Sequence, residues 1–449
     1  MSGDFKVSLY ELSKLNKTKR NVLLRRSEND LEVFLEKVKP IIEDVRIKGD
    51  AALVKYAAKF DNAHFESSEV GASKIEFDDA FNKLDSGVIE SLEYAADNIR
   101  RYHEEQIPGE MWMKEIRPGI LAGERYTPVD SAAIYSPRGK GSFPSVTLMG
   151  AIPAVVAGVP DPIILTPAGP DGKIDPATLV AARLSGVEQV YKAGGAVAVA
   201  SAAFGTESIP KCLKIEGPGS PWLAAAKQLL SNQISSRVPA GPSDSIVFAD
   251  STVDPRLAAM DLLIESEHGT DSSVFLVTTS RDIVDGVIKE LPGYWAKMSE
   301  PWATYSSTVL SGTNGGIILT DNLQQAYDFM NDYAPEHCQV LSSEPSKHLN
   351  HIRNASEILL GNWTAGTLAN YLLGPNCILP TNAQAKVHSP LGVLDFMKSA
   401  TIAQVSRGGF MEAAPLAHQF AKYEGFDGHA NAVSDLRSQI LDPHKRNEG

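Results

Sequence analysis

The sequence predicts an α/β protein that contains two parallel sheets. Between residues 131 and 242, short β-prone runs alternate with segments rich in alanine and glycine. A second series of strand-like and helix-like runs follows from residue 243 onward. Alternation of this kind is typical of βαβ units on a parallel sheet. A chain of 449 residues, 43% of them apolar, can bury more than one core, so we expect two α/β domains.

The part before residue 131 is predicted to be mainly helical. An apolar stripe at helical spacing covers residues 28–48, and a second run covers residues 51–60 after a break at Gly49-Asp50. The helical pattern returns over residues 78–106. Turn-forming residues then predict a turn-rich link, namely Pro118, Gly119 and Pro128.

The two α/β regions are predicted element by element from short apolar runs. In the region 131–242 the strands are expected at 132–135, 163–165, 190–191 and 213–215, and helices at 146–157 and 176–184. In the following region the strands are expected at 245–249, 274–277, 317–319, 339–341 and 358–360, and helices at 255–267, 281–291 and 323–333. Near the C-terminus, helices are expected at 411–421 and 431–440, on either side of a turn at 425–428.

Charge and cysteine content restrict the possible partners. The formal net charge is -13, which argues against nucleic acid or an anionic membrane as the main partner and favours a small-molecule ligand. The 3 cysteines are widely spaced and indicate neither a disulfide framework nor a cysteine zinc site. No apolar run approaches the roughly 20 residues that a membrane span needs, and the N-terminal segment lacks an apolar core. We therefore expect a cytoplasmic location.

One helix end combines two residues that can bind a metal. Asp254-Pro255 predicts a helix start, and Glu265 and His268 lie three residues apart just before Gly269. Their side chains project from one face, as a metal site needs. The alternative is a solvated acidic turn with a histidine that caps the negative end of the helix dipole. Capping histidines are more common than metal sites, so this stretch taken alone favours the cap.

A second candidate for chemistry is the pair Glu336-His337, which follows Ala334-Pro335. Proline ends the preceding helix, so we expect the pair on a loop. Histidine titrates near neutral pH, and a neighbouring carboxylate can orient it or activate a water, which suits proton transfer. Without further context, a polar pair on the surface is the more common explanation.

Three glycine-containing turns follow predicted strands, at residues 137–141, 194–196 and 217–219. Each allows a backbone to approach a pyrophosphate, although none is the full GxGxxG fingerprint and tight turns alone would explain them. Further along, Asn370 and Cys377 bracket a short loop, and a glycine-flanked turn carries Glu424 and His429.

With ESEHG, APEH, a GPN-to-LPT run and FDGHANAV in this order, the chain resembles the histidinol dehydrogenase family over nearly its whole length. The resemblance implies a zinc-dependent, NAD-linked alcohol dehydrogenase with two α/β domains of incomplete Rossmann type. It also implies a domain-swapped homodimer. Residues 1–130 with 243–386 would form the first domain, with N-terminal helices, and residues 131–242 the NAD-binding domain. Residues 387–449 would form a helical tail that reaches the partner subunit.

The resemblance also implies a role for individual residues. Zinc would be bound by Glu265, His268, Asn370 and His429, and the acid-base pair would be Glu336 and His337. Contacts with substrate fall on Ser243, Cys377, Glu424 and, because of its charge, Arg138. Contacts with the cofactor fall on Tyr135, Val197 and Ser220.

Several of these positions depart from the family's usual residues. Glu265 stands where glutamine is usual and Asn370 where aspartate is usual, so an amide and a carboxylate are exchanged within one zinc site. Cys377 replaces a histidine that surrounds histidinol, which weakens the case for that substrate. Arg138 stands where glycine is usual, Val197 where glutamine or histidine is usual, and Ser220 where asparagine is usual. Arg138 and Lys140 add positive charge that suits the cofactor or an anionic substrate group, and a surface arginine is the alternative.

Three functional hypotheses follow. The leading one is a dehydrogenase of this family that oxidises a small polyol, amino alcohol or sulfonated diol. The retained Glu336 allows oxidation by four electrons through an aldehyde to the carboxylate. The second is an authentic L-histidinol dehydrogenase. The third, a binding or regulatory homologue without catalysis, fits poorly because Glu336 and His337 are both retained.

Overall fold

The computed structural model describes residues 6–26, 31–138, 141–237 and 241–441. The chain divides into two compact units. The first contains Met1–Ile107 and Val129–Phe396, and the second contains Pro108–Pro128 and Met397–Gly449. No helix in the described part of the chain is both long enough and apolar enough to cross a lipid bilayer.

A four-stranded parallel sheet in the first unit confirms the strands predicted between residues 131 and 242. Its order is β6 (Val190–Lys192), β5 (Ile163–Thr166), β4 (Ala132–Tyr135) and β7 (Lys214–Glu216). The two predicted helices are α6 (Pro144–Val156) and α7 (Pro176–Ser185). Two more, α8 (Gly195–Phe204) and α9 (Pro221–Leu229), follow the glycine turns after β6 and β7. Those turns therefore connect strand ends to helix starts, as a phosphate-approaching turn would.

A six-stranded parallel sheet lies in the same unit and confirms the second α/β region. Its order is β1 (Leu9–Glu11), β10 (Gly315–Leu319), β9 (Ser273–Thr278), β8 (Asp244–Ala249), β11 (His337–Leu341) and β12 (Glu357–Leu360). Its helices are α10 (Pro255–Ser266), α11 (Arg281–Trp295), α12 (Trp302–Ser311), α13 (Leu323–Tyr333), α14 (Ser346–Leu349) and α15 (Gly366–Tyr371). The central strands β8 and β9 are buried along their whole length, as expected of a sheet covered on both faces.

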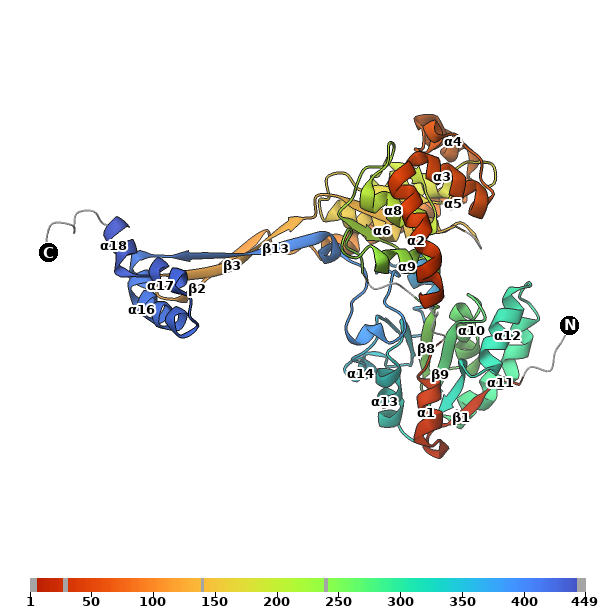
Figure 1. Ribbon diagram of the computed structural model, residues 1–449. Coiled ribbons are helices and arrows are strands. Elements are labelled where there is room, and N and C mark those ends of the chain that lie inside the picture. Colours follow the sequence, from red (N-terminus) through yellow and green to blue (C-terminus); the bar gives the residue numbers. More distant parts are fainter. Residues whose placement is uncertain (1–5, 27–30, 139–140, 238–240, 442–449) are drawn as a thin grey trace. The chain divides into compact units, whose positions relative to one another are not determined.

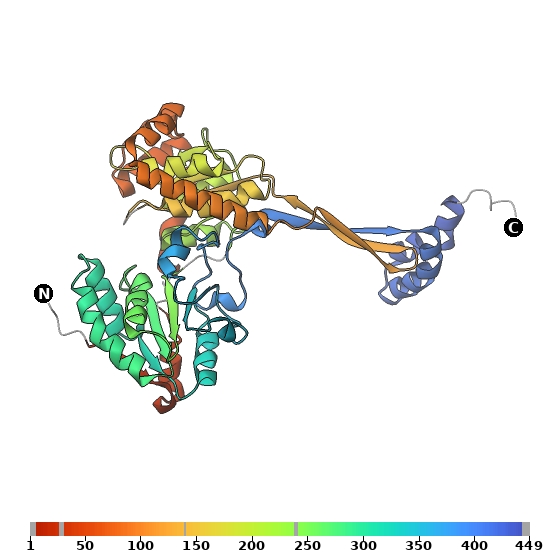
Figure 2. The same cartoon turned by 180° about the vertical axis from the view of Figure 1, so that it is seen from behind.

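The N-terminal helices are α1 (Lys17–Leu23), α2 (Leu31–Lys48), α3 (Asp50–Tyr56), α4 (Lys74–Lys83) and α5 (Ser86–Glu104). The predicted helix over 78–106 is two helices, because the Asp85 side chain accepts a hydrogen bond from the Gly87 backbone N–H (2.8 Å) and starts α5. α5 packs against α6 and α7 (Figure 2, orange).

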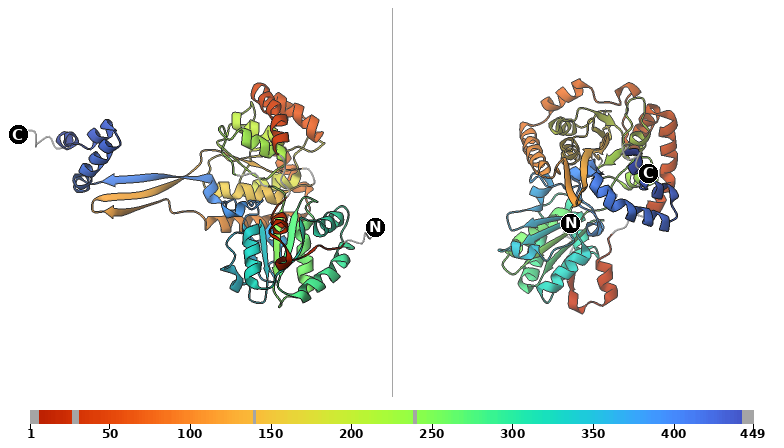
Figure 3. Two further views of the ribbon diagram at one scale, coloured as in Figure 1. Left: turned by 60° about the horizontal axis from the view of Figure 1, so that its bottom comes forward. Right: turned by 90° about the vertical axis from the view of Figure 1, so that its left-hand side faces the viewer.

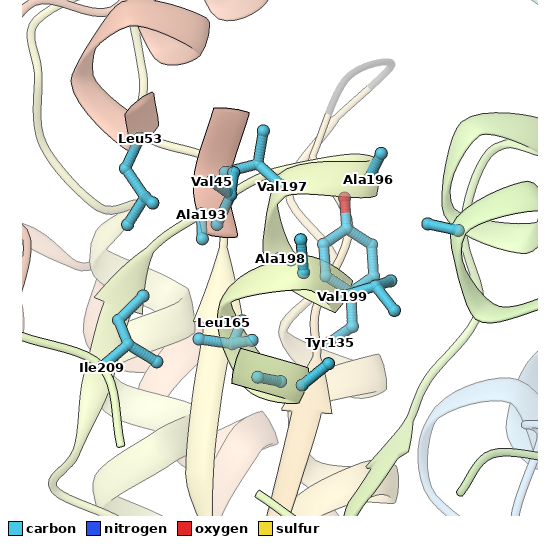
Figure 4. Packing of buried hydrophobic residues seen from close by; sticks show 14 of the residues in the cluster. Val45, Leu53, Tyr135, Leu165, Ala193, Ala196, Val197, Ala198, Val199 and Ile209 are labelled. Atoms are coloured by element: carbon cyan, nitrogen blue, oxygen red, sulfur yellow. The ribbon is translucent and has the colours of Figure 1, made fainter. Parts of the chain in front are cut away.

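The N-terminal helices pack differently from the predicted grouping of residues 1–130 with residues 243–386. β1 joins the six-stranded sheet, but α2 packs against α8 and α9 of the four-stranded sheet (Figure 1). Val45 and Leu53 enter the core that Leu165 and Val199 also line (Figure 4). An apolar stripe shows that a helix is covered, but it does not show which sheet covers it.

The second unit corrects two predictions. The turn-rich link is a β-hairpin of β2 (Met111–Arg117) and β3 (Ile120–Pro128), in which Gly119 turns with φ 71°. The tail is not purely helical, because β13 (Met397–Val405) pairs antiparallel with β3 (Figure 3). Three helices follow, α16 (Arg407–Tyr423), α17 (Asp427–Ala432) and α18 (Asp435–Leu441). β2 and β13 are largely exposed, so they lack the buried apolar run by which strands are recognised from sequence.

Candidate active site

The pair Glu336-His337 lies at the amino ends of three neighbouring parallel strands. His337 is the first residue of β11 and is aligned with Ser245 of β8 and Glu357 of β12. Glu336 and His337 are only 7% and 8% exposed. The expectation of a loop pair is therefore corrected for His337, which opens a strand, and the pair is buried. Ala334, with φ 50°, ends α13 and turns the chain directly into β11.

The imidazole of His337 is held between two carboxylates. Its Nδ1 lies 2.8 Å from Glu357 Oε2 and donates to that carboxylate, while its Nε2 lies 3.8 Å from Glu336 Oε1. Burial favours the neutral ring, but the nearby carboxylates outweigh burial and raise the pKa of His337 to about 10. Burial also raises the pKa of Glu336 to about 8. At neutral pH both groups therefore carry their proton in the metal-free protein, and a positive charge bound close by would lower the pKa of each.

Glu336 is fixed in place by Asp244, the first residue of β8. The Glu336 backbone N–H donates to Asp244 Oδ1 (2.8 Å), and the Asp244 N–H donates to Glu336 Oε2 (3.2 Å). Arg26 pairs with Asp244 (Nε to Oδ2, 3.1 Å) and lies over the Tyr333 ring. Asp244 is fully buried.

Sequence reasoning missed Asp244, Arg26 and Glu357. A signal existed for the two acids, because each is a carboxylate at the first position of an otherwise apolar strand. Arg26 lies far away in the sequence, and its position beside Asp244 depends on tertiary structure.

Three of the four predicted metal ligands lie together in the first unit. Glu265 Oε2 is 2.9 Å from His268 Nδ1, and Asn370 Nδ2 donates to Glu265 Oε1 (2.9 Å). α10 supplies Glu265, the turn after it supplies His268, and α15 supplies Asn370. The alternative of a solvated acidic turn is wrong for Glu265, which is 6% exposed.

The electrostatics of this trio favour a cation. Burial raises the pKa of Glu265, but His337 and His268 outweigh burial and lower that pKa to about 2. Burial opposes charge on His268, yet Glu265 raises the pKa of that ring to about 9. Glu265 thus keeps its negative charge although it is buried, and it needs positive neighbours.

The donor set fits zinc in chemistry and is incomplete in number. Carboxylate, imidazole and amide are oxygen and nitrogen donors of the kind zinc accepts, and a structural zinc takes four. Within the described ranges, no group of three or more His, Cys, Asp or Glu is placed to hold a metal. His429, the fourth predicted ligand, is an exposed residue of α17 in the second unit. Glu424, which follows the last residue of α16 in the same unit, is also exposed.

The predicted substrate residue Cys377 lies beside Glu357, the carboxylate that contacts His337. Its thiol donates to the Ala369 carbonyl (3.2 Å) and lies 3.7 Å from Glu357 Oε1. Burial and the nearby carboxylates raise the pKa of this thiol well above its usual value, so it is neutral. Ser243 directly precedes Asp244, and its carbonyl accepts the Ser273 N–H (3.0 Å).

The three predicted cofactor residues, Tyr135, Val197 and Ser220, line one cavity of about 340 Å³. Arg138 lines the same cavity, whereas Lys140 lies outside the described residues. The Tyr135 hydroxyl accepts the Gly195 N–H (3.1 Å) and points toward the start of α8 (Figure 4). Glu265, Glu336, His337 and Asn370 are not among the residues that line this cavity.

Known proteins resemble this chain over almost its full length. A protein described as a histidinol dehydrogenase homolog from Colwellia psychrerythraea is 53% identical over 98% of this chain and 99% of its own. A histidinol dehydrogenase from Synechocystis is 44% identical, over 96% of this chain and 99% of its own. The crystal structure of histidinol dehydrogenase from Elizabethkingia anophelis superposes with a TM-score of 0.90 at 31% identity, covering 97% of this chain and 99% of that one. The histidinol dehydrogenase family model matches residues 24–437, and the chain belongs to this family.

Proposed function

We propose that this protein is a zinc-dependent, NAD-linked dehydrogenase that oxidises a small alcohol other than histidinol. A polyol, an amino alcohol or a sulfonated diol is the substrate class we favour. The observation that carries the proposal is the buried arrangement Glu336–His337–Glu357, in which one imidazole nitrogen is fixed by a carboxylate and the other faces a second carboxylate. That arrangement suits a general base with a second acid-base group beside it.

Glu265, His268 and Asn370 would hold the zinc ion, with His429 as the fourth ligand. When bound, zinc supplies a positive charge that polarises the alcohol oxygen and offsets part of the negative charge of the buried carboxylates. The exchanged pair supports retention of the metal, because the carboxylate of Glu265 and the amide of Asn370 are in direct contact. One carboxylate and one amide remain, whichever residue carries each.

The chain's own groups move the protons. His337 Nε2 takes the hydroxyl proton of the alcohol while a hydride leaves its carbon for NAD, which gives an aldehyde. Glu336 then takes a proton from a water whose oxygen bonds to the aldehyde carbon. As the water oxygen bonds, His337 returns its proton to the aldehyde oxygen, so a neutral hydrate forms and Nε2 is free again. Nε2 then takes a hydroxyl proton of the hydrate, while a second hydride would pass to a second NAD, which yields the carboxylic acid. Glu336 and His337 finally release their two protons to solvent. Glu336 thus permits a four-electron oxidation.

The replacement at Cys377 argues against histidinol. A thiol committed to the Ala369 carbonyl is shorter than an imidazole and cannot reproduce its hydrogen bonds. A ligand that loses a hydrogen-bond partner in a buried site binds much more weakly, because its polar group is left without a partner. The name homolog, rather than histidinol dehydrogenase, for the relative at 53% identity is in line with this reading.

The second candidate is authentic L-histidinol dehydrogenase, favoured by the 44% identical relative of that name. A panel of alcohols including L-histidinol, glycerol and a sulfonated propanediol, followed by NADH absorbance, separates the two candidates. We expect histidinol to be at least about tenfold poorer in kcat/KM than the best panel member. Rescue of a histidine auxotroph that lacks this step, at normal expression, would establish the second candidate instead.

We also propose that the site is completed in a homodimer, in which one subunit supplies His429 and Glu424 to its partner. Mixing His337→Ala with His429→Ala subunits tests this. In an exchanged dimer, one of the two sites of a mixed dimer has both histidines, so activity returns above that of either variant alone. Without exchange, each site of the mixed dimer lacks one histidine and no activity returns.

A further inference from the structure

Asp261 is a buried carboxylate of α10 that the proposed mechanism does not use. It is 5% exposed and lies four residues before Glu265, so both side chains project from the same face of the helix. Its Oδ2 accepts a hydrogen bond from Nε2 of Gln339, which is also 5% exposed. Gln339 lies two residues after His337 on β11, so these two side chains share one face of the strand. The polar pair Asp261–Gln339 therefore lies one step along the same helix and strand from Glu265 and His337.

The carboxylate of Asp261 needs a hydrogen-bond donor because it is buried. Burial raises the pKa of Asp261 to about 6, although the hydrogen bond from Gln339 acts in the opposite direction. An acid with this pKa is mostly charged at neutral pH, and a charge without a partner in the interior is costly. The amide of Gln339 supplies the partner, so the two side chains join α10 to β11.

Gln339 makes a second connection through the same nitrogen. Its Nε2 donates to the Thr364 carbonyl (3.3 Å), in the turn between β12 and α15. The Thr364 hydroxyl donates to the Leu360 carbonyl (2.8 Å), and the Thr364 backbone N–H donates to the Gly361 carbonyl (3.2 Å), which fixes this turn. Both partners of the Gln339 amide are acceptors, so its nitrogen has to face them. One side chain thus holds both α10 and the turn that leads into α15.

The start of α15 lies directly against α10. A Cβ on Gly366, the first residue of α15, would be 3.4 Å from Cδ1 of Ile264 in α10. α15 has only 6 residues, so a shift at its start would also move Asn370 near its end. Asn370 Nδ2 donates to Glu265 Oε1 (2.9 Å), so the two helices meet at the proposed metal ligands. This contact depends on how α10 and α15 are anchored to the sheet.

We propose that Gln339 and Asp261 are positioning residues, which hold the two helices of the proposed zinc ligands in place and thereby set the metal affinity of the site. The inference rests on the proposed zinc-dependent function. Neither residue binds the ion. Loss of a group that orients metal ligands typically weakens metal binding by about 10- to 100-fold. Because Gln339 and Asp261 act through a helix and a turn, we expect the lower end of this range.

The test measures metal binding by the full-length protein, so it needs no substrate. Gln339→Met keeps the length of the side chain and removes both donated hydrogen bonds. We expect its zinc affinity, measured by competition with a chelator, to be about tenfold lower than that of the wild type. Cobalt(II) bound in place of zinc gives visible absorption bands that depend on the number and arrangement of its ligands. These bands should change in position and intensity in Gln339→Met.

Asn331→Leu is the matched control, because it also removes a buried amide that joins a helix to a loop. Asn331 of α13 donates to the His351 carbonyl (2.8 Å) and accepts the Arg353 N–H (2.7 Å). Its loss should lower the melting temperature of the zinc-free protein, as the loss of Gln339 does. Neither α10 nor α15 takes part in these bonds, so zinc affinity and the cobalt spectrum should stay as in the wild type.

Two changes at Asp261 complete the set. Asp261→Asn keeps an oxygen that can accept from Gln339, so it should lose less zinc affinity than Asp261→Ala, which has no acceptor. Thermal unfolding shows which variants are folded, and Asp261→Ala decides the question if Gln339→Met does not fold. Wild-type zinc affinity and an unchanged cobalt spectrum in the folded variant would overturn the positioning role, as would an equal loss of affinity in Asn331→Leu. A wild type that binds neither zinc nor cobalt would instead overturn the proposed zinc-dependent function.

Discussion

The two parallel sheets of the first unit place their polar groups at opposite ends of their strands. In the four-stranded sheet the cavity lies at the carboxyl ends, where Tyr135 ends β4. In the six-stranded sheet Asp244, His337 and Glu357 are the first residues of β8, β11 and β12, so the candidate active site lies at the amino ends. The rule that ligands bind at carboxyl ends describes the first site and not the second.

The difference has an electrostatic consequence. Carboxyl ends of strands lead into helix starts, whose partial positive charge suits a phosphate. Amino ends of strands follow helix ends, whose partial negative charge suits a cation. Glu265 adds a full negative charge at the end of α10, where burial alone would favour its neutral form. Under the proposed function, one sheet would hold an anionic cofactor, and the other would hold a metal and the groups that transfer protons.

The largest expected effect tests the proton-transfer side of this comparison. Replacing His337 with alanine should lower kcat about 10²- to 10⁴-fold, because the general base is lost, while NADH affinity at the other sheet stays the same. Steady-state NADH formation and NADH titration measure the two quantities. Glu357→Gln is the companion variant: it keeps a hydrogen-bond acceptor but not the charge, so a smaller loss is expected. Near-normal turnover in His337→Ala would remove the residue from the mechanism.

A second prediction concerns Asp261 of α10, whose carboxylate accepts a hydrogen bond from Gln339. Burial raises its pKa from 3.8 to about 6. Between these pH values the folded protein binds more protons than the unfolded chain, so this group's contribution to stability is lost as pH rises, by roughly 3 kcal/mol. Urea unfolding of the zinc-free protein from pH 4 to 7 should show the loss in the wild type and not in Asp261→Asn. Parallel pH profiles would contradict the raised pKa.

The strands of the two sheets were mostly predicted, because most of them are short, continuous apolar runs. Such a run can be recognised in the sequence without knowing which strands pair with it. β5 and β9 are examples, buried along their length. The sequence did not predict β2 and β13, which are mostly exposed and gain their structure from pairing with β3. It also could not assign α2 to a sheet, since an apolar stripe does not identify its partner.

The candidate site was predictable to a similar degree. Glu336 and His337 were singled out as an adjacent acid and base after a helix, but on their own a surface pair was the more common explanation. The family resemblance implied their role, together with the roles of Glu265, His268 and Asn370. Their burial was not foreseen, because it depends on β8 and β12 on either side. Asp61, which lines the cavity of the four-stranded sheet, was not singled out, because nothing in its local sequence indicates the π-helical turn that it ends.

A third prediction concerns the proposed metal ligands Glu265 and Asn370, beside the six-stranded sheet. Glu265→Gln removes the only carboxylate of the trio and should weaken zinc at least about tenfold, as measured by competition with a chelator. Asn370→Asp places a second carboxylate in contact with Glu265, and like charges should lower the melting temperature of the zinc-free protein. The double variant restores one amide and one carboxylate, so zinc affinity should return to within about threefold of wild type. Additive effects of the two changes would refute the exchanged-pair interpretation.

The smallest expected effect probes the cofactor side. Tyr135→Phe removes the hydroxyl that accepts the Gly195 N–H at the start of α8, so one partly buried donor loses its partner. The free energy of unfolding should fall by about 1 kcal/mol, and NADH affinity should fall a few fold, since α8 begins at the cavity. Zinc affinity should not change, because Tyr135 belongs to the four-stranded sheet, whereas α10 and α15, which carry the proposed metal residues, accompany the six-stranded sheet. Tyr191→Phe is the control, since its hydroxyl contacts Gln189 and the residue does not line the cavity. A shift in zinc affinity in Tyr135→Phe would show that the two sites are coupled, and the two sheets would then have to be treated as one functional unit.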